Sequence, residues 1–185
     1  MNIDIGGYKG KNDSYPKLQW KNLDHGGGDS IRYDLNSKKP FPFDNDSIDA
    51  YYTSHTLEHI EYENLPFVFD EIYRTLKKGC LIRIVVPDFS IGIQWYLKNP
   101  NKLFDKSSPG HPPFSPETAL GRLIAWAITP GQHRSAFDFD TIKWYLTKAK
   151  FINLKQMSFN KCNAVFDGKD KPRYASYSLY VEAQK

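Results

Sequence analysis

Residues 34–88 read DLNSKKPFPFDNDSIDAYYTSHTLEHIEYENLPFVFDEIYRTLKKGCLIRIVVPD. Residues 48–54 have strand character, and Asn64, suited to an N-cap, then precedes a helical pattern. The apolar residues of that helix recur at Leu65, Phe69, Ile72 and Leu76, and Lys77-Lys78-Gly79 is a typical helix ending. Residues 81–86 form a nearly continuous apolar run, typical of a strand buried on both faces of a parallel sheet. A strand, a helix and a strand in this order indicate a βαβ unit.

The same alternation extends in both directions from this stretch. Further strands are predicted at residues 2–5, 18–23, 31–33, 152–159 and 177–182, and helices at about 115–128 and 139–149. We therefore expect one α/β domain over residues 1–185. Its core would be a Rossmann-like, mostly parallel sheet of about seven strands with helices on both faces and the last strand antiparallel. Residues 89–137 would form a lid-like insertion over the carboxyl end of the sheet.

Composition excludes several classes of protein. The 185 residues are 40% hydrophobic and 15% aromatic, as in a folded domain, and no apolar run approaches the ~20 residues of a membrane helix. Cys80 and Cys162 are too few for a disulfide framework, and no basic-then-apolar leader is visible, so a cytoplasmic location is expected. The net charge of +4 is spread without clusters of basic and aromatic residues, which disfavours nucleic-acid binding.

Chemistry-bearing residues stand where the predicted strands end. Because the carboxyl ends of parallel strands share one edge, where such sheets bind ligands, these residues should meet there. They are Gly6-Gly7, Asp24, Asp34, His55 and Asp88.

The motifs and their order resemble class I methyltransferases that depend on S-adenosylmethionine (SAM), in particular small bacterial-type members. The family's "DL…LPFPDNSFDA" passage is similar to DL at residues 34–35 followed by PFPFDNDSIDA at residues 40–50. Its "SSHVLEHI" passage is similar to SHTLEHI at residues 54–60. EIYRTLKKG at 71–79 resembles "E-x-x-RVLKPGG", and LIRIVVPD at 81–88 resembles "LRIVVPD". GQHR at 131–134 is also similar to a segment of these proteins.

This resemblance implies roles in binding SAM. Gly6 and Gly7 would let the backbone approach the methionine part, with Tyr8 beside them; Asp24 would accept hydrogen bonds from the ribose hydroxyls. Asp34 and Leu35 would flank the adenine, and His55 would face both cofactor and substrate. Tyr8 and Tyr51 are candidates for stabilising the sulfonium charge.

The chain departs from the family's pattern at two positions, and the first departure supports an alternative function. Family members usually have Gly-x-Gly in the first turn, whereas this chain has Gly6-Gly7-Tyr8, and Cys80 stands where another glycine is common. The alternative is a methyltransferase-like protein that binds without catalysing.

His55-Thr56-Leu57-Glu58-His59 also matches H-x-x-E-H, the motif of a class of zinc metalloproteases. That chemistry needs both histidines on zinc and Glu58 as base, which does not suit a pentapeptide expected to span a strand-to-helix turn. We expect Glu58 and His59 to cap and pack this turn.

The catalytic candidates are His55, His133 and Asp88, with a histidine as general base for a hydroxyl acceptor. His55 could instead satisfy a backbone carbonyl, His133 could lie in a solvated loop, and Asp88 could cap the following segment. Asp4 is expected to order the glycine turn, and Arg83, inside a buried strand, to need an internal ion pair.

The acceptor is expected to be a small molecule. His111 lies in the lid, and Lys161, Lys169, Lys171 and Arg173 lie in a later loop on the same side. These cations point to an anionic substrate; the alternative is a solvated basic loop.

Overall fold

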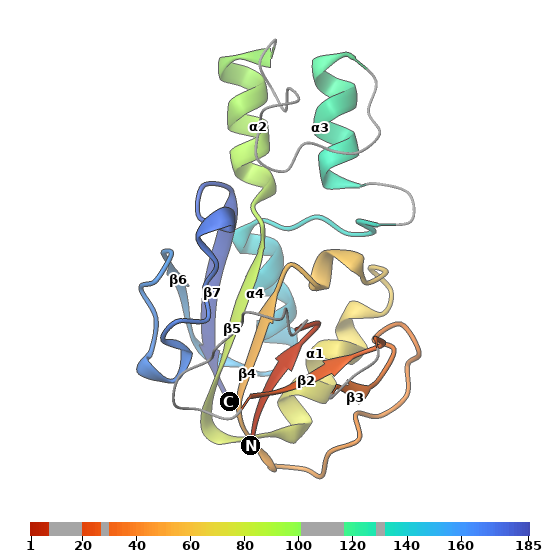
Figure 1. The fold of residues 1–185 in the computed structure, drawn as a ribbon, viewed down its shortest axis with the longest axis vertical. Coiled ribbons are helices and arrows are strands. Elements are labelled where there is room, and N and C mark those ends of the chain that lie inside the picture. Colours follow the sequence, from red (N-terminus) through yellow and green to blue (C-terminus); the bar gives the residue numbers. More distant parts are fainter. Residues whose placement is uncertain (8–19, 27–29, 101–116, 129–131) are drawn as a thin grey trace.

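The computed structural model describes residues 1–7, 20–26, 30–100, 117–128 and 132–185. Its sheet has the strand order β3-β2-β1-β4-β5-β7-β6 (Figure 1). The strands are β1 (Asn2–Ile5), β2 (Trp20–Asp24), β3 (Ile31–Arg32), β4 (Ile48–Ser54), β5 (Leu76–Pro87), β6 (Ile152–Met157) and β7 (Ser178–Gln184). The first five are parallel, and β7 lies antiparallel between β5 and β6. The predicted α/β sheet with an antiparallel last strand is confirmed.

Core residues pack on both faces of the sheet. The helices are α1 (Leu65–Thr75), α2 (Phe89–Lys98), α3 (Ala119–Ala127) and α4 (Phe139–Lys148), and the 3-10 turns are η1 (Leu57–His59), η3 (Ala164–Phe166) and η4 (Pro172–Tyr174). On one face α1 and α4 pack together, with Phe69 stacked 5.3 Å from Tyr145. On the other face, within the described residues, Phe166 of η3 packs on Tyr52 and Trp20.

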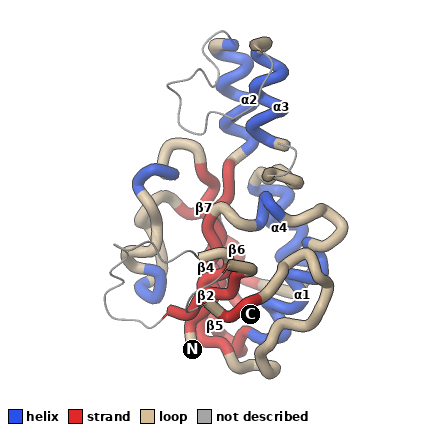
Figure 2. Tube along the Cα trace, turned by 45° about the vertical axis from the view of Figure 1, so that its right-hand side comes forward, coloured by secondary structure: helices blue, strands red, loops and turns tan. Residues whose placement is uncertain are grey.

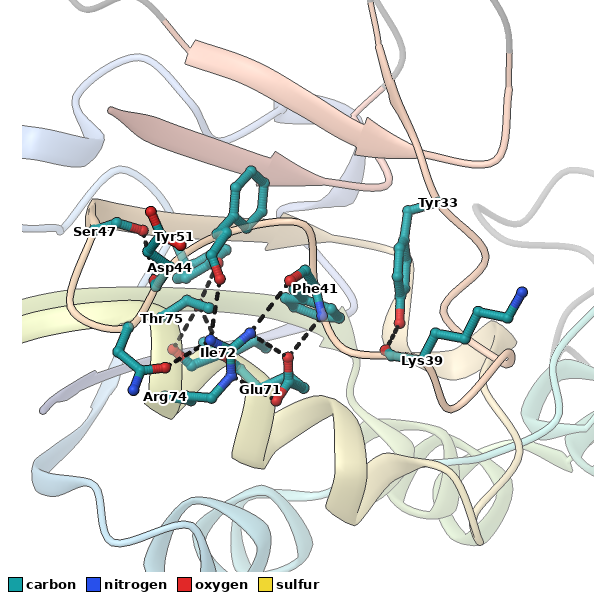
Figure 3. A network of polar contacts seen from close by, with 12 residues as sticks. Tyr33, Lys39, Phe41, Asp44, Ser47, Tyr51, Glu71, Ile72, Arg74 and Thr75 are labelled. Carbon is teal, nitrogen blue, oxygen red and sulfur yellow. Dashed lines mark hydrogen bonds and ion pairs between the residues drawn. The ribbon is translucent and has the colours of Figure 1, made fainter.

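Helix α1 also fixes the loop before β4 (Figure 3). Arg74 and Glu71 form an ion pair of 2.7 Å on this helix. Glu71 Oε2 accepts from the Phe41 amide at 2.6 Å, while Arg74 donates to the Phe43 carbonyl at 3.0 Å and to Asn45 at 2.7 Å. The aromatic and proline residues of the loop are therefore held by one helix turn, and Phe41 is buried.

Arg83 of β5 has the internal ion pair that the sequence predicted. The side chain is fully buried, and its Nε and Nη2 contact the two Asp170 oxygens at 2.9 and 2.6 Å. Nη1 lies 2.8 Å from Glu182 Oε1 on β7. This bidentate pairing joins the middle of the sheet to the loop after β6.

The predicted insertion contains a helical hairpin. Helices α2 and α3 run side by side beyond the end of the sheet (Figures 1 and 2). A Cβ on Gly92 of α2 would lie 2.6 Å from Trp126 of α3, so this glycine permits the close contact. None of the described helices combines the length and apolar character needed to cross a membrane.

The main differences from the predicted helices concern α1, α2 and α3. Helix α1 ends at Thr75 and not at Gly79, because Leu76 already pairs with Ile48 of β4. Helix α2 replaces a segment for which no helix was predicted, and α3 begins at Ala119 behind Thr118, which caps Gly121 at 3.1 Å. The first residues of that predicted helix, 115–116, lie outside the described residues.

Candidate functional site

A cavity opens at the carboxyl ends of β1, β2 and β4. Strand order reverses at β1, whose neighbours are β2 and β4, and a crevice forms at such a switch point. The cavity holds about 630 Å³, within the range of small-molecule and cofactor sites. Of the residues predicted from the sequence, it is lined by Gly6, Asp24, Asp34, Leu35 and His55.

The glycine turn after β1 is set by its neighbours in the fold. Gly6 has a φ of +72°, and a Cβ there would lie 2.1 Å from Thr56 Oγ1. A Cβ on Gly7 would lie 2.5 Å from Asp4 Cγ. Both positions exclude a side chain for steric reasons, and Asp4 packs beneath the turn as expected. Tyr8 lies outside the described residues.

The acidic residues after β2 and β3 shape their own turns at the cavity wall. Asp24 Oδ1 accepts from the Gly26 amide at 3.0 Å, and Asp34 Oδ1 accepts from the Asn36 amide at 2.9 Å. Leu35 packs at the edge of the main core. These hydrogen bonds therefore fix the carboxylates of Asp24 and Asp34 at the wall of the same cavity.

His55 is held from several directions. It adopts a left-handed φ of 53°, uncommon outside glycine, and its amide donates to Val85 O at 2.9 Å. Nε2 lies 2.9 Å from Ser178 Oγ, and Nδ1 lies 3.4 Å from Glu58 Oε1. Tyr174 stacks on the ring at a centroid distance of 3.7 Å. An oriented imidazole at a strained backbone position is typical of a functional site.

Two other candidates do not face this cavity. Asp88 caps α2, since Oδ1 accepts from the Ser90 amide at 3.0 Å and from Ser90 Oγ at 2.6 Å; capping was the alternative reading of this residue. Tyr51 is fully buried against α1, with its hydroxyl 2.7 Å from Thr75 Oγ1, so the prediction that it stabilises the sulfonium is wrong.

His133 does not line this cavity, although Gln132 and Arg134 on either side of it do. It lines a small pocket with Glu58, and its Nδ1 is 2.8 Å from the Trp126 carbonyl. Burial lowers the pKa of His133, which favours the neutral ring. The ring of His59, at the cavity wall, lies edge-on to it at 5.1 Å. As expected, the H-x-x-E-H pentapeptide spans the end of β4 and a 3-10 turn.

The basic loop is partly structural. Lys169 is 3% exposed; it pairs with Asp4 Oδ2 at 2.5 Å and its Nζ lies over the rings of Trp20 and Tyr52. A role for Lys169 in binding an anionic substrate is therefore wrong, because its charge is buried in this pair. Arg173 is exposed, and its Cζ lies 4.5 Å from the centre of the Tyr174 ring, which stacks on His55.

Further wall residues were not singled out from the sequence: Arg32, Tyr33, Asn36, Thr56, Ile60, Gln132 and Arg134. Gln132 and Arg134 flank His133 in the segment GQHR, and the signal of this segment in the sequence was its resemblance to methyltransferases alone. Arg134 pairs with Glu61 at 2.8 Å, which fixes this segment beside η1. No local sequence pattern predicts that Arg134 contacts a residue as distant in the chain as Glu61.

Comparisons with known proteins agree with this picture. Residues 15–84, which include Asp24, Asp34 and His55, match a family model described as a methyltransferase domain. No curated protein matches the sequence.

Solved structures share the whole fold at low sequence identity. A SAM-dependent methyltransferase from Archaeoglobus fulgidus is 15% identical, with a TM-score of 0.58 over 100% of this chain and 85% of its own. One from Mesorhizobium loti is 16% identical, with a TM-score of 0.54 over 100% and 90%. One from Methanosarcina mazei is 16% identical, with a TM-score of 0.56 over 100% and 91%. The predicted fold is confirmed by these structures, and the match over residues 15–84 agrees with the resemblance to methyltransferases.

Proposed function

We propose that this chain is a SAM-dependent methyltransferase, that it binds its cofactor in the cavity at the ends of β1, β2 and β4, and that it methylates a small-molecule acceptor. One observation carries the assignment of the site. Five of the residues expected to contact the cofactor line one cavity of about 630 Å³, although they are up to 49 positions apart in the sequence: Gly6, Asp24, Asp34, Leu35 and His55.

The residues present fit the cofactor. Gly6 keeps the floor of the site free of a side chain, and we assign it to the methionine part. Asp24 would accept from the ribose hydroxyls through Oδ2, because its contacts to the Gly26 amide and to His25 both use Oδ1. Asp34 and Leu35 would border the adenine.

When bound, SAM would supply the methyl group of its sulfonium; in the in-line transfer to an acceptor oxygen the methyl–sulfur bond would break, with S-adenosylhomocysteine as the leaving group. We assign His55 as the general base for a hydroxyl acceptor. The acceptor would take the place of Ser178 Oγ at Nε2, while Glu58 and Tyr174 keep the ring in position. The hydroxyl proton passes to Nε2 as the new O–C bond forms.

An anionic acceptor fits the charges around the opening. Arg32 and Arg134 line the cavity, and Arg173 lies over Tyr174, which stacks on His55. Lys169 is not part of this set. The α2–α3 hairpin and the segment that carries Arg134 would then form the acceptor side of the site.

Calorimetric titration with SAM and S-adenosylhomocysteine tests the cofactor assignment. Wild-type protein should bind both, and Asp24→Ala should weaken binding by roughly 10- to 150-fold, the effect of losing hydrogen bonds to a charged group. Asp49→Ala is the matched control, because this carboxylate lies at the opposite end of β4 and pairs with Lys77. A folded wild type that binds neither compound would instead favour the non-catalytic alternative.

A second experiment tests the base. With an acceptor found by screening small anionic hydroxyl compounds against labelled SAM, His55→Ala should lower kcat by roughly 10²- to 10⁴-fold. The affinity for SAM should change far less. Equal losses in both quantities, or no loss, would contradict the role of His55.

A further inference from the structure

Glu58 is a buried carboxylate with an unusual lack of partners. The residue is 1% exposed, and within the described part of the chain neither carboxylate oxygen accepts a hydrogen bond. His55 Nδ1 lies 3.4 Å from Oε1, too far for a good hydrogen bond. A buried charge without hydrogen bonds is costly, so such a group is expected to have a partner beyond those that the described residues supply.

Two histidines lie near this carboxylate, and a hydrogen bond to a carbonyl determines which ring nitrogen of each one carries the proton. His59 Nδ1 lies 2.9 Å from the Gln132 carbonyl, and His133 Nδ1 lies 2.8 Å from the Trp126 carbonyl. Because a carbonyl can only accept, each Nδ1 carries the proton and each neutral ring presents the lone pair of Nε2. Histidines that bind metals are usually oriented in this way, by donating their other N–H to a carbonyl or carboxylate.

We propose that Glu58, His59 and His133 form a binding site for a divalent transition-metal ion, best suited to Zn²⁺. One ring nitrogen of each histidine and one carboxylate oxygen of Glu58 lie within 4.8 Å of one another. Zinc bonds of about 2 Å put ligands roughly 3.3 Å apart, so binding draws the three side chains inward by a small amount. Two imidazoles and one carboxylate are a zinc ligand set that leaves a fourth position for water or substrate.

The backbone explains how His133 reaches a residue 75 positions earlier. The Arg134 and Ser135 amides donate to the Glu58 carbonyl at 2.6 and 3.1 Å, and Ser135 Oγ donates to the Leu57 carbonyl at 3.1 Å. Tyr62 adds hydrogen bonds to Ala136 at 2.9 Å. The segment that carries His133 is therefore fixed along η1, and an ion at this point would join it to the turn after β4.

This site differs from the one implied by H-x-x-E-H. There, His55 and His59 would bind the ion and Glu58 would act as base; here Glu58 is a ligand, His133 replaces His55, and His55 stays with Ser178. Since His59 also lines the large cavity, the fourth position lies close to the proposed acceptor side. An acceptor oxygen is the ligand that this position would take.

Zinc titration without SAM tests the site independently of methyl transfer. Chelator-treated, dialysed protein should bind one Zn²⁺ per chain by calorimetry, and Co²⁺ should give the visible absorption of a four-coordinate ion. His59→Ala should weaken zinc binding by about tenfold or more. Because His59 is exposed, this substitution leaves the core intact. His133→Ala should have the same effect, with its fold checked by circular dichroism.

His25→Ala is the matched control, because its side chain is 88% exposed and lies outside the cluster. Excess zinc should raise the Tm of the wild type and of this control, but not that of His133→Ala. The proposal fails if the wild type binds less than one ion, which is expected if Glu58 serves only as the partner of His55. It also fails if His25→Ala weakens binding as much as His59→Ala does.

Discussion

Replacement of Gly6 by alanine should destabilise the protein through two separable effects. The residue has a φ of +72°, where a side chain costs about 1–2 kcal/mol. The new Cβ would also lie 2.1, 2.4 and 2.8 Å from three atoms of the Thr56 side chain. Thr56 is buried and donates to the Ile5 carbonyl at 3.2 Å, so it cannot turn away freely. Overpacking of this kind costs about 1–3 kcal/mol, which makes the total about 2–5 kcal/mol.

Gly168 provides the control for the backbone effect. It has a nearly equal φ of +77°, but a Cβ there would meet no atom within 4 Å. Gly168→Ala should therefore cost the conformational part alone, about 1–2 kcal/mol. The difference between the two variants measures the clash with Thr56.

Urea denaturation of both variants gives these free energies, and thermal unfolding should show shifts of about 2–4 °C per kcal/mol for a domain of this size. In the background of Thr56→Ala, which removes two of the three close atoms, Gly6→Ala should cost less. Equal losses for Gly6→Ala and Gly168→Ala would refute the argument that Thr56 sets the glycine requirement.

Two further predictions concern ion pairs. Arg83→Met should destabilise the protein by about 3–5 kcal/mol in urea denaturation, because Asp170 would remain buried without its partner. Lys77→Met, which breaks an exposed pair, should leave the stability nearly unchanged. The hydrogen bond from Arg74 lowers the pKa of Glu71, so this carboxylate stabilises the fold above its ordinary pKa near 4.5 and loses that contribution as the pH falls. The stability difference between wild type and Glu71→Gln should therefore shrink from about pH 6 to about pH 3; a constant difference would contradict the assignment.

Much of the fold could be predicted from local patterns. The apolar run at residues 81–86 lies inside β5, and Asp138 caps α4 by accepting from the Thr141 amide at 2.8 Å. Helix α2 was missed because Gly92 weakens a helical pattern, and its packing against Trp126 becomes visible in the tertiary structure alone.

The site was predictable where topology alone brings residues together. The carboxyl ends of parallel strands must share an edge, so Gly6, Asp24 and His55 could be grouped without a structure. The cluster of Glu58 with His133 depends on hydrogen bonds between distant segments, which no spacing rule reports. Lys169 was misassigned for the same reason: its carboxylate partner lies in the first strand.

The position of β7 between β5 and β6 has a consequence for synthesis. β6 leaves the ribosome before β7, and in the described sheet its pairing partner is β7. Until residues 178–184 emerge, the nascent chain carries two unpaired strand edges, at β5 and at β6. Unpaired edges are the sites at which chains join one another. The interval between the synthesis of β6 and of β7 is therefore when a nascent copy is most exposed to aggregation, and a fragment that stops before Ser178 would remain in that state.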